Sequence, residues 1–232
     1  MAEAVIEYGA HVFISSSSSE RVERAVDSLC SSYPSARDRI IGYACDLGDE
    51  NTVEENVVRL LSQVGQLDHI VYTAGDSNPP TPISEVTLET LQRARTVRYT
   101  GPIFVAKHAS KYLRNSHESS IILTTGVVTE KPLLGWSAIA GPRAAVANLS
   151  KALALDLKPI RVNVVSLGAV DTGVWDQLDP GRKERLIGTL VEKSTTGRIA
   201  QPADVVEAYL YCMKDKNVTG STVSTNGGVL LT

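Results

Sequence analysis

Short apolar runs of strand length alternate along this chain with longer segments of helical period, and this alternation limits the folds open to it. The apolar runs lie at residues 11–15, 39–45, 68–73, 120–125, 160–166 and 221–225. The helical segments lie at residues 2–8, 20–31, 52–63, 88–113, 142–157, 182–193 and 203–213. Because parallel strands are joined by helical crossovers, the pattern predicts a parallel sheet with helices on both faces. A chain of 232 residues suits one such α/β domain over residues 1–232.

Prolines interrupt two of the helical segments. Gly101-Pro102 lies inside segment 88–113, where a proline removes a hydrogen bond and crowds the preceding turn, so we expect a kink or a break. Pro142 is accommodated if a helix begins there, with the proline in its first turn. This interpretation leaves residues 135–140 as a loop.

Composition and charge exclude several classes of function. The formal net charge of -3 offers no broad basic field, so neither nucleic acid nor an anionic membrane surface is an expected partner. No apolar run approaches the roughly 20 residues that span a bilayer, and the first residues do not resemble a signal peptide. The three cysteines show no CxxC spacing and the four histidines no ligand pattern. We therefore expect a cytoplasmic protein with reduced thiols and no metal site.

Four short motifs follow the predicted strands in order. They are residues 45–47 (CDL), 73–75 (TAG), 161–172 (RVNVVSLGAVDT) and 226–228 (NGG). Together they resemble the short-chain dehydrogenase/reductase family, which has an acidic residue near adenine, an Asn-Ala-Gly loop, an Arg-Val-Asn strand with a Pro-Gly-x-x-x-Thr turn, and a closing Asp-Gly-Gly. The resemblance covers residues 1–232 and implies a Rossmann-like, doubly wound parallel sheet in a single domain.

The start of the chain departs from the family pattern. The family opens with a strand and a glycine-rich turn, whose amides hold the pyrophosphate at a helix N-terminus. Residues 1–10 resemble instead the end of the helix that follows that turn. We therefore expect a sheet that lacks the usual first strand and glycine-rich turn. Because unpaired buried backbone groups each cost about 1–3 kcal/mol, the strand at 11–15 should pair beside the strand at 68–73, or another chain should fill the gap.

The residues at the family's catalytic positions have changed as well. By the resemblance, Arg98 stands for the asparagine of the long helix, and Gly126, next to Thr125, stands for the serine. Ile139 and Arg143 stand for the tyrosine and lysine of the Tyr-x-x-x-Lys pair, in which the tyrosine exchanges a proton with the substrate. Isoleucine exchanges no proton, and arginine stays protonated at any useful pH. We therefore expect ordinary carbonyl reduction to be lost.

The remaining polar and aromatic residues are expected to meet at the carboxyl edge of the sheet, where open α/β sheets bind ligands. The expected catalytic residues are Asp171, Arg98, Arg143 and Thr125, with Asp171 as acid or base. The expected substrate-binding residues are Trp136, Trp175, Ser137 and Ile139. Structural alternatives stay open: the tryptophans as loop anchors, Asp171 as a helix cap or turn residue, and the arginines in salt bridges.

The segment 131–137 (KPLLGWS) is similar to a Pro-x-x-Gly-Trp stretch of fungal biosynthetic reductases. Some of their relatives are Diels–Alderases that act on indole alkaloid precursors. Trp136 and Trp175 as paired aromatic walls, with Asp171 as acid or base, would suit a flat or cationic small molecule and its cyclisation. The similarity implies that this molecule is a polycyclic or heteroaromatic natural-product intermediate.

The serine run at residues 15–19 follows the strand after which relatives distinguish NAD from NADP. Its hydroxyls and the nearby Arg21 would accept a 2′-phosphate, although a solvated helix-capping loop is an equal alternative. Since the pyrophosphate turn is missing, we expect no required cofactor and only a vestigial NADP preference. The vestigial positions are Ser15, Ser16, Asp46 and Thr172.

The leading hypothesis is a cofactor-independent cyclase or isomerase of specialised (secondary) metabolism on a short-chain dehydrogenase/reductase scaffold, not a hydride-transfer enzyme. The first alternative is an NADP-dependent oxidoreductase with a truncated N-terminus. The second is a non-catalytic pseudoenzyme or binding protein. The helical segments 88–113 and 142–157 correspond to the surfaces through which relatives assemble, so we expect a homodimer or homotetramer.

Overall fold

The computed structural model describes residues 1–76, 79–173, 175 and 179–232. Its strands form two parallel sheets. In the first sheet β1 (Val12–Ser16) pairs with β2 (Ile40–Ala44), and in the second β3 (His69–Tyr72), β4 (Ser120–Gly126), β5 (Arg161–Leu167) and β6 (Thr222–Thr225) lie in that order. Each predicted strand is confirmed to within one residue at either end. The predicted α/β class with a doubly wound parallel arrangement is confirmed.

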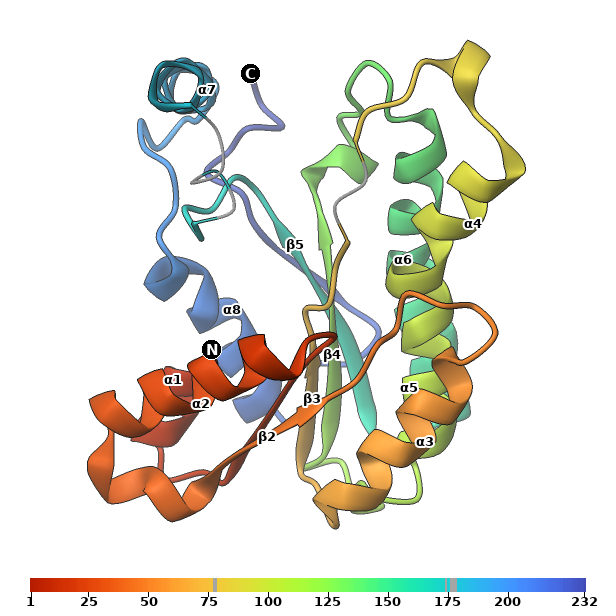
Figure 1. The fold of residues 1–232 in the computed structure, drawn as a ribbon, viewed down its shortest axis with the longest axis vertical. Helices are drawn as coiled ribbons and strands as arrows, with labels where there is room; N and C mark the ends of the chain where they lie inside the picture. Colours follow the sequence, from red (N-terminus) through yellow and green to blue (C-terminus); the bar gives the residue numbers. More distant parts are fainter. Residues whose placement is uncertain (77–78, 174, 176–178) are drawn as a thin grey trace.

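Helices connect these strands and cover both faces (Figure 1). They are α1 (Ala2–Glu7), α2 (Ser19–Ser32), α3 (Val53–Val64), α4 (Leu88–Arg95), α5 (Gly101–Ala109), α6 (Ser137–Asp156), α7 (Pro180–Glu192) and α8 (Pro202–Lys214). Short 3-10 helices lie at Pro34–Arg39, Ile83–Glu85 and Val127–Thr129, and a π-helix lies at Thr96–Thr100. Within the described ranges, no helix combines the length and the apolar character that a membrane span requires.

The four-stranded sheet buries side chains on both faces with the period of two that strands impose. Ile121 and Leu123 of β4 pack into the cluster formed with α3, α5 and α6. The residue between them, Ile122, packs with Tyr209 and Cys212 of α8. Figure 1 shows these two groups of helices on opposite sides of the sheet. Each fully buried aliphatic side chain contributes roughly 1.5–3 kcal/mol, and this packing fixes the carboxyl edge of the sheet.

The first two strands have a core of their own. Val12 and Ile40 pack with Ile6 and Ala36 in a cluster that α1 and α2 cover. The strands pair in register from Val12↔Ile40 onward, and no backbone ladder joins β1 to β3 within the described ranges. The predicted pairing of residues 11–15 beside residues 68–73 is therefore wrong. The reason is that the buried side chains of β1 are already packed within the β1–β2 layer. A gap filled by another chain stays a prediction.

The two proline-interrupted segments gave one confirmed and one wrong prediction. Segment 88–113 is broken, as expected, into α4, the π-helix and α5, with Pro102 in the first turn of α5. In contrast, α6 begins at Ser137, so the predicted loop at 135–140 and the helix start at Pro142 are wrong. Pro142 lies in the second turn, where its missing N–H and its ring affect the single carbonyl of Ala138, four residues earlier.

Candidate functional site

A cavity of about 530 Å³ opens at the carboxyl edge of the four-stranded sheet. Its floor comes from strand ends, namely Thr73 after β3, Thr124–Gly126 of β4 and Leu167–Val170 around the end of β5. Residues of α6 and α8 form its sides. The volume lies in the range typical of small-molecule pockets, which is roughly 300–1,000 Å³. The fold therefore places a ligand-sized cavity at the predicted edge.

Arg98 reaches this cavity from the π-helix that follows α4. A π-turn widens the helix locally, and such turns are frequent at functional sites. Arg98 Nε lies 3.4 Å from Asp76 Oδ1, and both side chains are mostly buried. Gly75 permits this placement, since a Cβ there would lie 2.2 Å from Arg98 Nη2. The predicted alternative of a salt bridge thus holds for Arg98, although the same guanidinium lines the cavity.

Arg143 enters the cavity from the second turn of α6. Its guanidinium carbon lies 4.9 Å from the centre of the Trp136 ring, which is a cation–π contact. Its Nε is buried and has no hydrogen-bond partner among the described residues. Burial, and next the charge of Arg98, lower the pKa of Arg143 to about 10, against a smaller opposing effect of Asp76. Arg143 is therefore protonated at neutral pH.

Thr125 lines the cavity, but its hydroxyl is already engaged. Thr125 Oγ1 donates a hydrogen bond to the backbone carbonyl of Arg143 at 2.9 Å, which ties the end of β4 to α6. Gly126, at the family's serine position, also lines the cavity and offers no hydroxyl. The site therefore has no free hydroxyl where the family has its serine.

Two predicted substrate-binding residues of α6 lie outside the cavity wall. Ile139 is 3% exposed and packs in the interior instead of lining the cavity. Ser137 is exposed at the first position of α6 and does not line it either. Trp136, directly before the helix, does line the cavity as predicted. The position that carries the family's tyrosine thus holds a buried apolar side chain.

Asp171 and Trp175 are not brought to the cavity. The backbone N–H of Asp171 donates to the carbonyl of Ala200 at 2.9 Å, next to the Val170↔Ala200 bridge. The side chain of Asp171 is half-buried and does not line the cavity, whereas the adjacent Thr172 does. Trp175 is also half-buried and outside the wall. The expected set therefore divides: Arg98, Arg143, Thr125 and Trp136 meet, and the other four members do not.

Sequence reasoning did not identify two residues of this site. Tyr209 of α8 lines the cavity, its hydroxyl shares a hydrogen bond with Thr124 Oγ1 at 2.8 Å, and burial raises its pKa. The helical spacing of Val205, Val206 and Tyr209 was the available signal, but it is equally typical of a core helix. Asp76, the partner of Arg98, directly follows the 73–75 motif. Its position as an acidic residue shortly after a predicted strand was the signal for a site residue.

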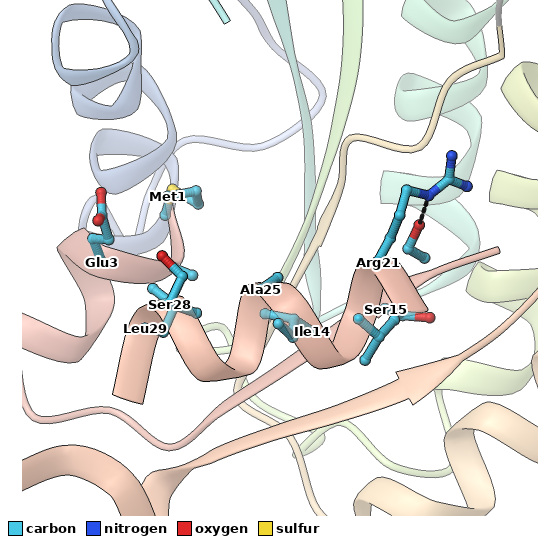
Figure 2. A pocket seen from close by; sticks show the side chains of 11 residues that line it. Met1, Glu3, Ile14, Ser15, Arg21, Ala25, Ser28 and Leu29 are labelled. Carbon is cyan, nitrogen blue, oxygen red and sulfur yellow. Dashed lines mark hydrogen bonds between the residues drawn. The ribbon is translucent and has the colours of Figure 1, made fainter. Parts of the chain in front are cut away.

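A second pocket of about 380 Å³ lies where β1 ends beside α2 and α1. Figure 2 shows Arg21 and Ser15 at one end of this pocket and Met1 and Glu3 at the other. Arg21 Nε donates to Ser16 Oγ at 3.2 Å, and Arg21 Nη2 donates to Ser17 Oγ at 2.6 Å. A guanidinium with several hydroxyls is suited to a phosphate group, so these residues fit the 2′-phosphate of NADP.

The other nucleotide contacts expected from the family are less complete. Asp46 is exposed, lines neither cavity, and accepts a hydrogen bond from the Gly48 N–H at 2.9 Å. Thr172 lines the first cavity and not the pocket beside the serine run. Within the described part of the chain, no group of three or more His, Cys, Asp or Glu side chains is placed to hold a metal ion.

The fold and the motifs at the sheet edge agree with comparisons to known proteins. A family model described as an SDR-like Rossmann domain matches residues 1–232. The chain belongs to the short-chain dehydrogenase/reductase family. It is 40% identical over 236 residues to the short-chain dehydrogenase/reductase fsr5 of Gibberella fujikuroi, and 42% identical over 237 residues to malC of Malbranchea aurantiaca. Each alignment covers 100% of this chain and 89% of the relative.

Solved structures give the same result. The chain is similar to the MalC reductase/Diels–Alderase from Malbranchea aurantiaca, with a TM-score of 0.93 and 40% identity over 100% of this chain and 91% of that chain. It is also similar to a small-chain dehydrogenase in complex with NADPH, with a TM-score of 0.76 and 26% identity over 83% of this chain and 87% of that chain. The family assignment and the resemblance to a fungal Diels–Alderase are confirmed.

Proposed function

We propose that this chain is an enzyme of specialised metabolism that binds a small molecule in the 530 Å³ cavity and promotes its cyclisation, isomerisation or dehydration without hydride transfer. One observation carries the proposal. Ile139 occupies the family's tyrosine position and is buried outside the cavity, so the general acid of carbonyl reduction is absent there. The similarity to MalC, which is described as a reductase/Diels–Alderase, supports a non-redox reaction on this scaffold.

The described lining suits catalysis by positioning and electrostatics. Arg98 and Arg143 are its charged side chains, and no carboxylate, histidine, lysine or cysteine of the described chain lines the cavity. Guanidinium groups stabilise negative charge that develops on a substrate oxygen. The partial burial of both arginines strengthens this electrostatic effect. Trp136 offers a flat face that restricts the substrate, which favours a reactive conformation.

The test is turnover in the absence of nicotinamide, followed by mass spectrometry. A cyclisation or isomerisation leaves the mass of the substrate unchanged, and a dehydration removes one water. The purified protein should convert members of a panel of dienes, enones and hydroxylated heteroaromatic precursors in this way without NADPH. Conversion that requires NADPH and adds two hydrogens would contradict the proposal.

A second candidate function is NADP-dependent oxidoreduction, because the Arg21 pocket fits a 2′-phosphate. A bound nicotinamide would supply a hydride, and this chain would contribute phosphate binding through Arg21 and its serine neighbours. Fluorescence titration with NADPH tests this candidate, with Arg21→Gln as the variant. Arg24→Gln is the matched control, since Arg24 lies one turn further along α2 in an exposed pair with Glu20. Saturable binding lost only in Arg21→Gln, with steady ketone turnover, would favour the oxidoreductase.

A third candidate function is that of a non-catalytic protein that binds a small molecule in the same cavity as the proposed enzyme. Both bind a small molecule, and turnover alone separates them. Saturable ligand binding with unchanged substrate in every reaction of the panel would favour the binding protein.

A further inference from the structure

We infer that the ligand of the 530 Å³ cavity carries a negatively charged oxygen, and that Arg143, assisted by Arg98, is the group that holds it. The inference rests on the proposed small-molecule function and specifies its substrate class, which is a flat apolar acid. Carboxylates, enolates and phenolates of this kind share the chemistry that a guanidinium recognises.

The charge balance inside the cavity favours an anionic ligand. Two guanidinium groups line it, and no acidic side chain of the described chain does. Arg98 has a counter-ion in Asp76, which is not among the residues that line the cavity. Arg143 forms no ion pair with any described residue, and its contact is the face of Trp136. A half-buried cation without a counter-ion is costly, and an anion supplied by the ligand would remove that cost.

Arg143 also has unused hydrogen-bonding capacity. Its buried Nε–H has no acceptor in the described part of the protein. Buried donors are nearly always paired in folded proteins, so an orphan donor at a cavity wall indicates an acceptor that arrives with a ligand. The lowered pKa of Arg143 agrees, since burial and the neighbouring Arg98 charge both disfavour its cationic form. A bound anion would oppose both effects.

The remaining wall of the cavity is largely apolar. Val127, Val128, Leu133 and Val205 present apolar surface, and Trp136 adds an aromatic face. Such a wall fits the hydrocarbon body of a planar molecule, and the arginines fit its acidic end. Of the flat or cationic ligands expected from the sequence, a flat acid is favoured, because a cation would meet two guanidinium groups and no acidic side chain in the described lining.

Calorimetric titration of 2-naphthoate against 2-naphthamide tests the inference at neutral pH. The two probes have the same ring system and nearly the same size, and they differ in the charge on the oxygen. Since a charge-assisted hydrogen bond contributes more than a neutral one, naphthoate should bind on the order of 10- to 100-fold more tightly. Arg143→Gln should remove this preference. Arg143→Lys should keep part of it, because a lysine keeps the charge and loses the planar fork.

Two further variants show which of the two pockets binds naphthoate. Arg24→Gln, on the exposed surface of α2, should leave the preference for naphthoate unchanged. If Arg21→Gln removes the preference in place of Arg143→Gln, the anion binds in the serine-lined pocket and the inference is wrong. Circular dichroism and thermal melting establish that each variant is folded.

The remaining outcomes separate this inference from the proposed function. Equal affinity for naphthoate and naphthamide, weakened for both by Trp136→Ala, would refute the acidic substrate class and leave a small-molecule cavity in place. No detectable binding of either probe would also overturn the inference. The proposed function fails by a different result, namely the NADPH-dependent gain of two hydrogens in the turnover assay.

Discussion

Gly75→Ala should displace Arg98 and leave the fold intact. A Cβ at this position would lie 2.2 Å from Arg98 Nη2, 2.6 Å from Cζ and 2.9 Å from Nη1, and ordinary contact begins at 3.4 Å. The guanidinium must therefore retreat by about 1.2 Å, which is the difference between 2.2 and 3.4 Å. Gly75 is not among the described glycines with positive φ, so alanine meets no backbone strain there. The clash falls on the end of a flexible side chain and is relieved by its movement.

The expected energies follow from this geometry. The alanine restricts the unfolded chain and so stabilises the protein by about 0.4–1 kcal/mol, while a weakened Arg98–Asp76 pair has the opposite effect at a similar size. The free energy of unfolding, measured by urea denaturation, should therefore change by less than about 1 kcal/mol. Naphthoate affinity should fall roughly 10-fold, because a displacement of about 1 Å weakens a directed contact strongly.

The matched control is Gly188→Ala in α7, where an added Cβ has nothing within 4 Å. It should raise the stability of the helix by about 0.5–1 kcal/mol and leave naphthoate binding unchanged. A folded Gly75→Ala protein with unchanged naphthoate affinity would refute the reasoning that the position of Arg98 matters. A loss of stability well beyond 1 kcal/mol would show that the guanidinium cannot move as argued.

Four other predictions concern the site, the termini of a helix and assembly. Ile139→Tyr combined with Arg143→Lys should not produce NADPH-dependent ketone reduction, since the buried position 139 lies outside the cavity; steady turnover would contradict this. Asp171→Asn should leave naphthoate affinity unchanged, because Asp171 does not line the cavity, and a 10-fold loss would restore it to the site. The Arg198 guanidinium and the Gln201 N–H lower the pKa of Asp204 from 3.8 to about 2. That carboxylate therefore stabilises the fold fully above pH 3.8, and this contribution is lost as the pH falls through about 2. Asp204→Asn should melt lower than the parent at neutral pH, and the difference should shrink as the pH falls from 3.8 toward 2. The exposed leucines of α4 and α6 predict a homodimer or homotetramer, and a monomeric mass by light scattering at micromolar concentration would contradict it.

Strands and most helices were predictable because their signals are local. The short apolar run of β4 and the apolar periods of α2 and α3 lie in consecutive residues, and the motifs at the strand ends identified the family. The extent of α6 was not predictable by the same rule, since Pro142 is usually a helix start. The first turn of α6 forms before the proline, because the Ile139 and Ala140 N–H groups donate hydrogen bonds to the Trp136 carbonyl.

The membership of the site was only partly predictable for a related reason. Arg98, Thr125 and Arg143 lie on elements whose direction follows from the sheet, so their convergence could be expected. The path of the segment around Asp171 depends on a hydrogen bond from the Asp171 N–H to the Ala200 carbonyl. No pattern in the neighbouring residues predicts this contact. Arg98, Thr125 and Arg143 could therefore be placed from sequence. Ser137 and Ile139, whose positions depend on where α6 begins, and the residues of the connection after β5 could not.

The separate core of β1 and β2 has a consequence for how the protein opens. Without a ladder from β1 to β3 in the described chain, the smaller sheet is linked to the larger one through side chains, while the larger sheet is continuous from β3 to β6. Units connected in this way open as separate foldons with their own free energies. Amide protons of β1 and β2 are thus set to exchange with solvent in sub-global openings that leave β4 and β5 protected. We therefore expect the layer of β1 and β2 to unfold locally while the sheet from β3 to β6 stays folded.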